Sequence, residues 1–445
     1  MTHIIAPEKN QIRLCEKRSE DIDMNIGERI RQIRIHKKFT QGELVSGICS
    51  ITYLSRIENG QIKPSTSFLE KISQKLDVDY KFLVDADHED VEPKLLHICE
   101  KYKNEKIISE KDLSLLELYV RETTSIPLLL KAYGTLIYYH ARNNNLTYIE
   151  SIVERASQLI PNQVETKHND DFIYYLMARG LYYYNKQDNI TAQEIYVQIE
   201  SLLGGEESVQ HADVYYNLSI IKQRLYQDQN ISRLYSTKAY KLYKKLNMED
   251  RVIDVLIILA LQYHLDKLHE KALETLKQAE LGAEAINNSM YFPIILYNYA
   301  KIYQGLKDYT NAIKYYEKSL QLSEFLPNEA DKVYTLRSLI EIYIEFKDWE
   351  TVNRLMDDAF KILAVQDVPY AHVQLYSFKA TIFKLRGDYY GYEKEMQKAI
   401  EMGLEKKQYT LVRELSTELG NHFYDNRAYK MSAKYLKISV ENSLN

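Results

Sequence analysis

The chain has 445 residues, 45% of them hydrophobic and 27% charged, so it can bury a large core and does not have the composition of a disordered protein. Its 14 glycines and 8 prolines are few for this length, which favours long helices over a β fold rich in turns. We therefore expect an all-α protein.

Charge is unevenly distributed along the chain. The formal net charge is −5, but residues 25–83 hold ten Lys and Arg against six Asp and Glu, a net +4 that leaves −9 for the remainder. A basic segment attached to an acidic body suggests a module that binds a polyanion. The charge alone is weak support, so the motifs must decide.

Several functional classes lack their sequence signatures. Cys15, Cys49 and Cys99 are far apart and form no CxxC pair, which favours neither a disulfide framework nor a zinc site. The longest apolar run, residues 255–261, is far shorter than the ~20 residues that a bilayer requires. No GxSxG, P-loop or HExxH motif is present, and the 11 histidines show no ligand spacing. We expect a cytoplasmic protein that is not an enzyme, binds no membrane, and holds neither a metal nor a cofactor.

Residues 1–23 are expected to be an N-terminal extension, because "MNIGERIRQIR" from Met24 looks like a natural start. We give the extension no function, and an upstream mis-assigned start remains as good an explanation as a tail. Residues 26–39 then have the pattern of an amphipathic helix.

Further short helices are predicted up to residue 84. Thr40 and Ser50 are residue types that cap helices, and Asn59-Gly60 ends the third helix with a glycine suited to the left-handed position. Pro64 and Ser65 open a fourth helix, and residues 80–84 are a fifth. The second and third helices meet at the tight turn "GICS" (47–50).

This segment resembles the helix-turn-helix of the Cro and phage-repressor class. The matching residues are Thr40, Gln41, Leu44, Ser55, Arg56, Ile57, Glu58, Asn59, Gly60, Pro64, Ser65 and Leu69. The match departs from the phage repressors in having one residue fewer before the "SRIENG" turn. The resemblance implies a DNA-binding domain over residues 24–84, with Leu44, Ile57 and Leu69 in its core and Arg34 paired with Glu58.

In that class the third helix enters the major groove, while the start of the second helix contacts the phosphate backbone. The resemblance therefore implies these DNA-binding residues: Thr40, Gln41, Ser50, Ile51, Thr52, Tyr53, Ser55, Arg56, Asn59 and Lys63. Two alternatives stay open at this point: Arg56 as a solvated helix charge, and Tyr53 as a ring packed against the second helix.

After an expected linker at residues 85–108, the chain repeats itself every 40 residues. Small or medium residues recur at one position and small residues at a second, while aromatic residues occupy a third and mostly alanine a fourth. The columns are Ala272, Ala312, Val352, Tyr392 and Ser432; Ala279, Ser319, Ala359, Ala399 and Ser439; Tyr263, Tyr303, Tyr343, Phe383 and Phe423; and Ala260, Ala300, Ile340, Ala380 and Gly420. Small residues at regular positions predict two closely crossing antiparallel helices in each unit.

The units resemble the tetratricopeptide repeat, with "ELGNHF" (418–423) and "YGTLIYY" (133–139) showing its Leu-Gly or Tyr-Gly form. The period continues less regularly towards the N-terminus and gives about eight helix pairs. We expect residues 109–445 to form a right-handed tetratricopeptide superhelix that binds a peptide and mediates oligomerisation.

A helix-turn-helix with this turn, followed by such an array, resembles the peptide-controlled quorum-sensing regulators of Gram-positive bacteria, especially the neutral-protease regulator branch. The resemblance implies a cytoplasmic transcription regulator, associated with sporulation, that binds double-stranded DNA and a short signalling oligopeptide. It also implies a homodimer, with a tetramer on peptide binding left open. The alternative function is that of a Rap-like protein that captures a phosphorelay response regulator, alone or as a second role.

Peptide-binding candidates lie on the first helices of the pairs. Asn298 and Asn217 could each donate to and accept from a peptide backbone through one amide. Lys301, Arg337 and His264 could meet a carboxylate of the peptide, although each is more often a solvated charge.

Overall fold

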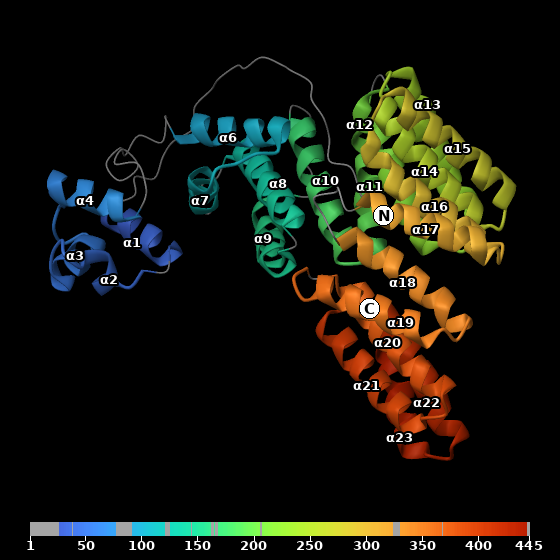
Figure 1. Ribbon diagram of the computed structural model, residues 1–445. Helices are drawn as coiled ribbons and strands as arrows, with labels where there is room; N and C mark the ends of the chain where they lie inside the picture. The colour runs from blue at the N-terminus through green and yellow to red at the C-terminus, as the bar shows by residue number, and fades with distance from the viewer. Residues whose placement is uncertain are drawn as a thin grey trace. The chain divides into compact units, whose positions relative to one another are not determined.

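The computed structural model describes residues 26–37, 39–76, 91–120, 125–143, 145–161, 164, 168–204, 207–323, 330–366 and 368–442. These residues form helices and turns, with no strand among them, as expected of an all-α chain (Figure 1). The chain divides into an N-terminal unit that ends at Leu225 and a C-terminal unit that begins at Tyr226. Each unit is described by itself.

The N-terminal helical domain consists of α1 (Ile26–His36), α2 (Gln41–Val45), α3 (Ile51–Glu58) and α4 (Thr66–Leu76). Its core contains apolar side chains from all four helices, among them the three that the resemblance places there: Leu44, Ile57 and Leu69. The extension at residues 1–23 and the fifth helix expected at residues 80–84 lie outside the described residues.

Two further helices, α6 (Val91–Glu105) and α7 (Glu110–Tyr119), precede the regular array. Helix α6 occupies most of the segment that was expected to be a linker, and it packs on α8 through Leu95, Ile98 and Cys99 among its buried residues. Apolar residues at helical spacing, together with an absence of glycine, explain why this segment is a helix and not a linker.

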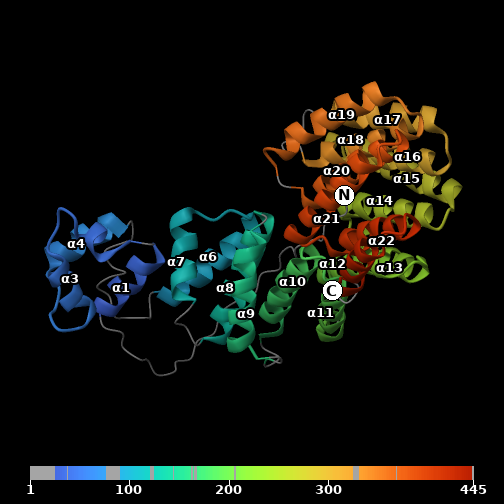
Figure 2. The same cartoon turned by 90° about the horizontal axis from the view of Figure 1, so that it is seen from below.

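Sixteen helices follow within the described part of the chain. The N-terminal unit contains α8 (Ile126–Arg142), α9 (Leu146–Leu159), α10 (Asn169–Asn185), α11 (Asn189–Leu202) and α12 (Val209–Leu225). The C-terminal unit contains α13 (Asn230–Lys245), α14 (Glu249–Leu265), α15 (His269–Ala285), α16 (Phe292–Gly305), α17 (Tyr309–Ser323), α18 (Ala330–Glu345), α19 (Trp349–Leu363), α20 (Pro369–Leu385), α21 (Tyr389–Glu405), α22 (Tyr409–Asp425) and α23 (Tyr429–Glu441), with the short 3₁₀ helix η3 (Ser289–Tyr291) before α16. Figure 2 shows the same helices from below.

The reversals between helices repeat with a period of 20 residues. A residue with positive φ ends the helix at Gln187, Asn247, Lys267, Asn287, Lys307, Lys347, Gly387, Lys407 and Arg427. At each first-to-second reversal of the C-terminal unit, the next N–H donates back to the carbonyl of the aromatic column, as Asp308 N does to Tyr303 O at 2.9 Å. This is the Schellman pattern, in which a left-handed residue satisfies the last carbonyls of a helix.

The three columns of mostly small residues, which contain Ala260, Ala272 and Ala279, are buried where helices cross, as the period predicted. In the C-terminal unit the first helices of successive pairs also contact one another: α14 packs on α16, α18 on α20 and α20 on α22, while Gln304 of α16 donates to Glu341 of α18. Close contact between first helices curves the array so that they line its inner side. Side chains that point away from the core on these helices therefore face a common surface.

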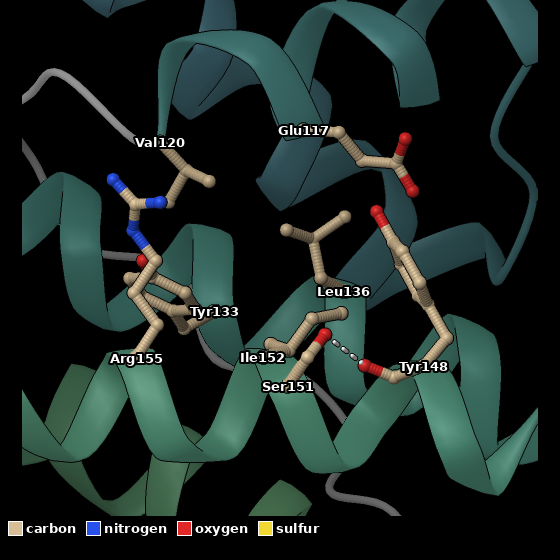
Figure 3. Close-up of a pocket in the computed structure, with 8 residues that line it drawn as sticks. All are labelled: Glu117, Val120, Tyr133, Leu136, Tyr148, Ser151, Ile152 and Arg155. Atoms are coloured by element: carbon tan, nitrogen blue, oxygen red, sulfur yellow. Dashed lines mark hydrogen bonds between the residues drawn. The ribbon is translucent and has the colours of Figure 1, made fainter. Parts of the chain in front are cut away.

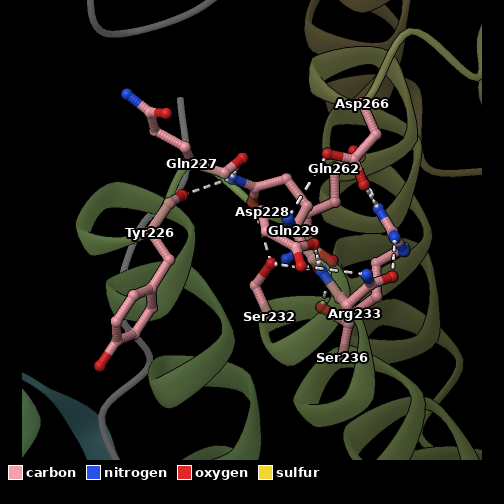
Figure 4. Close-up of polar contacts among 10 residues, drawn as sticks. Tyr226, Gln227, Asp228, Gln229, Ser232, Arg233, Ser236, Gln262 and Asp266 are labelled. Carbon is pink, nitrogen blue, oxygen red and sulfur yellow. Dashed lines mark hydrogen bonds and ion pairs between the residues drawn. The ribbon is translucent and has the colours of Figure 1, made fainter.

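A buried polar network fixes the start of the C-terminal unit (Figure 4). Arg233 on α13 forms an ion pair with Asp266, and Ser236 donates to the fully buried Gln262 at 2.9 Å. Gln229 donates its amide to the carbonyl of Tyr226 at 2.8 Å. Buried polar groups are costly unless they are hydrogen-bonded, and the contacts of Arg233 with Asp266 and of Ser236 with Gln262 join α13 to the end of α14.

Gly27 allows α1 to approach the end of α3 closely. A Cβ at this position would lie 1.7 Å from the carbonyl oxygen of Ile57, a backbone atom that has no freedom to move away. At Gly42, by contrast, a Cβ would meet only the end of the Ile51 side chain, at 3.4 Å.

We therefore predict that Gly27→Ala lowers the unfolding free energy of the N-terminal domain by about 1–3 kcal/mol, the usual cost of overpacking. Gly42→Ala is the matched control and should change it by less than ~1 kcal/mol. Hydrogen–deuterium exchange of α1 and α3 in the full chain measures both effects. Equal protection in the two variants would contradict the close approach.

Candidate functional site

One face of α3 is open to solvent while the opposite face is buried. Leu54, Ile57 and Glu58 point into the domain. The other face carries exposed or half-buried residues at helical spacing: Ile51, Thr52, Ser55, Arg56 and Asn59. All five belong to the DNA-binding residues that the sequence suggested.

Side-chain caps begin both α2 and α3. Thr40 and Glu43 form a capping box, with Thr40 N donating to Glu43 Oε2 at 2.8 Å and Glu43 N donating to Thr40 Oγ1 at 3.2 Å. The bonds from the Thr40 backbone and hydroxyl lower the pKa of the Glu43 carboxyl. Ser50 Oγ accepts from Tyr53 N at 3.2 Å, so its hydroxyl caps α3.

The pair between Arg34 and Glu58 is present and joins α1 to the end of α3. Arg34 Nε and Nη2 donate to the two carboxylate oxygens of Glu58 at 2.6 and 2.9 Å, and Arg34 Nη1 donates to the carbonyl of Phe39 at 3.0 Å. The Glu58 side chain is 2% exposed. A bidentate pair of this kind has a fixed geometry, so it sets the orientation of α3.

Two of the suggested DNA-binding residues have structural partners. Gln41 Nε2 donates to Glu58 Oε2 at 2.7 Å, so this amide supports the buried carboxylate and is not turned outward. The Tyr53 ring packs edge-on against Phe68 of α4 with centroids 5.4 Å apart, so the ring contact that the structure shows is with the fourth helix. Lys63, in the segment between α3 and α4, is exposed.

In the C-terminal unit, three suggested peptide-binding residues come together on adjacent first helices. His264 is on α14, Lys301 on α16 and Arg337 on α18. Burial lowers the pKa of His264 to about 4, helped by His269 and by the charge of Lys301. Burial also lowers the pKa of Lys301, and the nearby charge of Arg337 lowers it further. The charge of Lys301 thus acts on His264, and that of Arg337 acts on Lys301, which places Lys301 near both of the other side chains.

Arg337 is held by groups that the sequence reasoning did not identify. Its Nη1 donates to Gln374 Oε1 at 2.9 Å and its Nη2 to Glu341 Oε2 at 3.4 Å, while Gln304 Nε2 also donates to Glu341, at 3.2 Å. The Arg337 Nε is buried without a hydrogen-bond acceptor among the described atoms. The 40-residue period contained the signal for two of these groups, because Gln304 and Glu341 are the repeat equivalents of His264 and Lys301.

The surroundings of Lys301 leave a positive charge that is only partly balanced. Glu341 favours its charged form, but burial and Arg337 outweigh that effect. No salt bridge to Lys301 exists within the ranges that the structure describes. A half-buried pair of cations with one shared carboxylate is suited to bind a further carboxylate.

The two asparagines differ in accessibility. Asn298, one turn before Lys301, is 7% exposed and donates Nδ2 to its own helix at Ile294 O, 2.8 Å away, which leaves its Oδ1 as an acceptor. Asn217 is 0% exposed and lies beside the Tyr196 hydroxyl in the N-terminal unit. Asn217 is therefore buried in this conformation, with its side chain hydrogen-bonded to Tyr196, and its contact with a peptide stays a prediction.

A separate cavity of about 180 Å³ opens between α7, α8 and α9 (Figure 3). Its lining includes Glu117, Tyr133, Tyr148 and Arg155, and none of the residues suggested from the sequence contributes to it. Ligand pockets usually measure ~300–1,000 Å³, so this cavity is too small for an oligopeptide.

Within the described ranges, no group of three or more His, Cys, Asp or Glu side chains is arranged to hold a metal ion. None of the helices there combines the length and the apolar character that a membrane-spanning segment needs.

Two family models match parts of the chain. Residues 27–87 match a helix-turn-helix domain, and residues 294–325 match a tetratricopeptide repeat. The transcriptional activator NprA of Geobacillus stearothermophilus is 22% identical over 413 residues, which cover 89% of this chain and 98% of NprA.

Solved structures share the fold. NprR in complex with its cognate peptide NprX has a TM-score of 0.54 at 16% identity and covers 81% of this chain and 100% of NprR. A Rap protein complexed with the competence and sporulation factor has a TM-score of 0.56 at 16% identity and covers 80% of this chain and 98% of the Rap protein. The chain therefore joins an N-terminal helix-turn-helix domain to tetratricopeptide repeats, and it is similar over most of its length to a transcriptional activator, in agreement with the resemblance seen in its sequence.

Proposed function

We propose that this chain is a quorum-sensing transcription regulator that reads operator DNA with α3. The observation that carries the proposal is the exposed face of α3, held at both ends by caps and by the buried Arg34–Glu58 pair. A helix presented in this way fits the major groove, where Thr52, Ser55 and Arg56 have the chemistry to contact base edges and phosphates. The similarity to the activator NprA supports this assignment.

The array would bind a short signalling peptide along its first helices. Lys301 and Arg337 would receive a carboxylate of the peptide, with neutral His264 beside them and Asn298 Oδ1 accepting from a peptide N–H. NprR was solved with a peptide and shares this fold, which supports the proposal. The protein would act in the cytoplasm, without catalysis, as a homodimer that reads two half-sites.

The alternative is that the array captures a response regulator. It rests on the likeness of the array fold to a Rap protein. The capped α3 surface favours the DNA-reading role, because protein capture by the array gives no reason for an exposed polar face on α3.

For the DNA-reading surface, we predict that Arg56→Ala weakens DNA binding about evenly across DNA sequences. The slope of log binding constant against log salt concentration should become shallower by about 1, because one phosphate contact is lost. Thr52→Ala should instead change selectivity at one base position, by ~1–3 kcal/mol. Fluorescence anisotropy against operator fragments selected from genomic DNA measures both. Lys71→Ala, an equal charge change on α4, is the control.

The Arg34→Ala variant distinguishes a residue that positions α3 from a residue that contacts DNA. Removal of this partner leaves Glu58 poorly compensated, so we expect thermal stability and DNA binding to fall together, whereas Arg56→Ala should leave stability unchanged. Full DNA affinity in all of these variants would show that α3 does not read DNA.

For the array, we predict that Lys301→Gln weakens peptide binding about tenfold, which corresponds to ~1.4 kcal/mol. The probe is the tightest binder from a library of short synthetic peptides, measured by isothermal titration calorimetry. A version of this peptide with neutral side chains in place of its carboxylates and with an amidated C-terminus should bind Lys301→Gln and wild type with equal affinity. Lys318→Gln on the second helix α17 is the control, and equal loss in both variants would contradict the proposed site.

A further inference from the structure

One edge of the C-terminal unit carries a row of exposed apolar side chains. The edge consists of the five turns that join the first to the second helix of each pair, at residues 266–268, 306–308, 346–348, 386–388 and 426–428. Every turn has at least one exposed large apolar residue in or beside it: Leu268, Leu306, Phe346, Tyr390 and Tyr429. Tyr390 is 78% exposed and Phe346, in the central turn, is 51% exposed.

Direct contacts connect the three middle turns of the row to one another. The rings of Tyr309 and Phe346 meet edge-on at 5.4 Å, which joins the second turn to the third. The guanidinium of Arg386 lies 5.1 Å from the centre of the Trp349 ring, which joins the fourth turn to the third. We call this surface, made of the five turns and the rings beside them, the turn edge.

The turn edge also has both signs of charge at each of its middle turns. Lys307 precedes Asp308, and Lys347 precedes Asp348, while Arg386 and Asp388 flank Gly387. The left-handed backbone places each lysine in a fixed position, and the aspartates are fixed as caps. A partner with a single sign of charge would meet repulsion at every turn, whereas a surface with the same mixed pattern would not.

The exposed area is sufficient for a stable interface. Nine large apolar side chains in or next to the five turns are between two-fifths and four-fifths exposed: Leu265, Leu268, Leu306, Phe346, Leu385, Tyr389, Tyr390, Tyr424 and Tyr429. With ~200 Å² for a fully exposed side chain of this size, they offer roughly 900 Å². Specific interfaces bury about 800 Å² on each partner, so the turn edge alone would meet that requirement.

We propose that a second copy of this chain packs against the turn edge, with the two copies antiparallel around the central turn. In that arrangement Phe346 meets its own equivalent near the two-fold axis, and the second turn of one copy faces the fourth turn of the other. Lys307 then faces the partner's Asp388, and Asp308 faces the partner's Arg386. This inference rests on the proposed function in that it names the interface of the dimer that reads two half-sites.

The first test measures self-association of the full chain by sedimentation velocity, without DNA or peptide. Wild type should be a dimer at micromolar concentration, and Phe346→Glu should raise the dimer Kd at least about thirtyfold, as expected for a central anchor. Val365→Glu is the control, because Val365 is 87% exposed in the opposite turn between α19 and α20. Circular dichroism verifies that each variant keeps its helices.

The second test uses the symmetry directly. In a chain carrying Cys15→Ser, Cys49→Ser and Cys99→Ala, Lys347→Cys should form a covalent dimer under mild oxidation, and Val365→Cys should not. A monomeric wild type, a dimeric Phe346→Glu chain, or crosslinking through residue 365 alone would overturn the inference. Operator binding is scored separately, so a failed turn edge with intact DNA binding leaves the proposed function standing.

Discussion

The C-terminal unit depends on one repeated backbone constraint, the reversal between helices at a residue with positive φ, which recurs at multiples of 20 residues from Asn247 to Arg427 within the described ranges. At most of these positions the residue is Lys, Asn or Arg and not glycine, so the chain accepts a conformation that costs an L-residue on the order of 1 kcal/mol. The cost is offset because the following N–H binds the helix end and, at Asp308, Asp348 and Asp388, a carboxylate caps the next helix. Because most reversals of the C-terminal unit are alike, its helices recur at a regular spacing.

The regular spacing of the helices has a functional consequence. It brings the same face of each first helix to the inner side, so residues about 40 apart in sequence become neighbours there. His264, Lys301 and Arg337 come together in this way, although each alone would be an ordinary solvated charge. The partial burial that lowers the pKa of Lys301 is also what would make an incoming carboxylate bind well there. The same reversals place apolar and charged residues on the turn edge.

The sequence predicted the parts of this structure that depend on period and on local residue type. The column Tyr263, Tyr303, Tyr343, Phe383 and Phe423 identified the aromatic position whose carbonyl accepts the turn hydrogen bond, and the small-residue columns are buried as predicted. The pair of Arg34 with Glu58 followed from the resemblance and is present. Contacts with neighbouring elements could not be predicted. Tyr196 is hydrogen-bonded to Asn217, the Tyr53 ring packs on Phe68, and the Gln41 amide donates to Glu58. These contacts join residues 15 to 21 positions apart in ways that no periodicity encodes, and α6 formed where only a linker was expected.

The central claim is that the array and the DNA-reading domain are parts of one regulator, with peptide binding coupled to operator binding. Coupling between two binding sites is reciprocal, because a ligand shifts an equilibrium only by its differential affinity for the two states. The most direct measurement is a calorimetric titration of the selected peptide into the full chain with and without saturating operator DNA. The account predicts peptide affinities that differ by a factor of about 5–150 between the two titrations. Equal affinities, with both ligands bound, would contradict it.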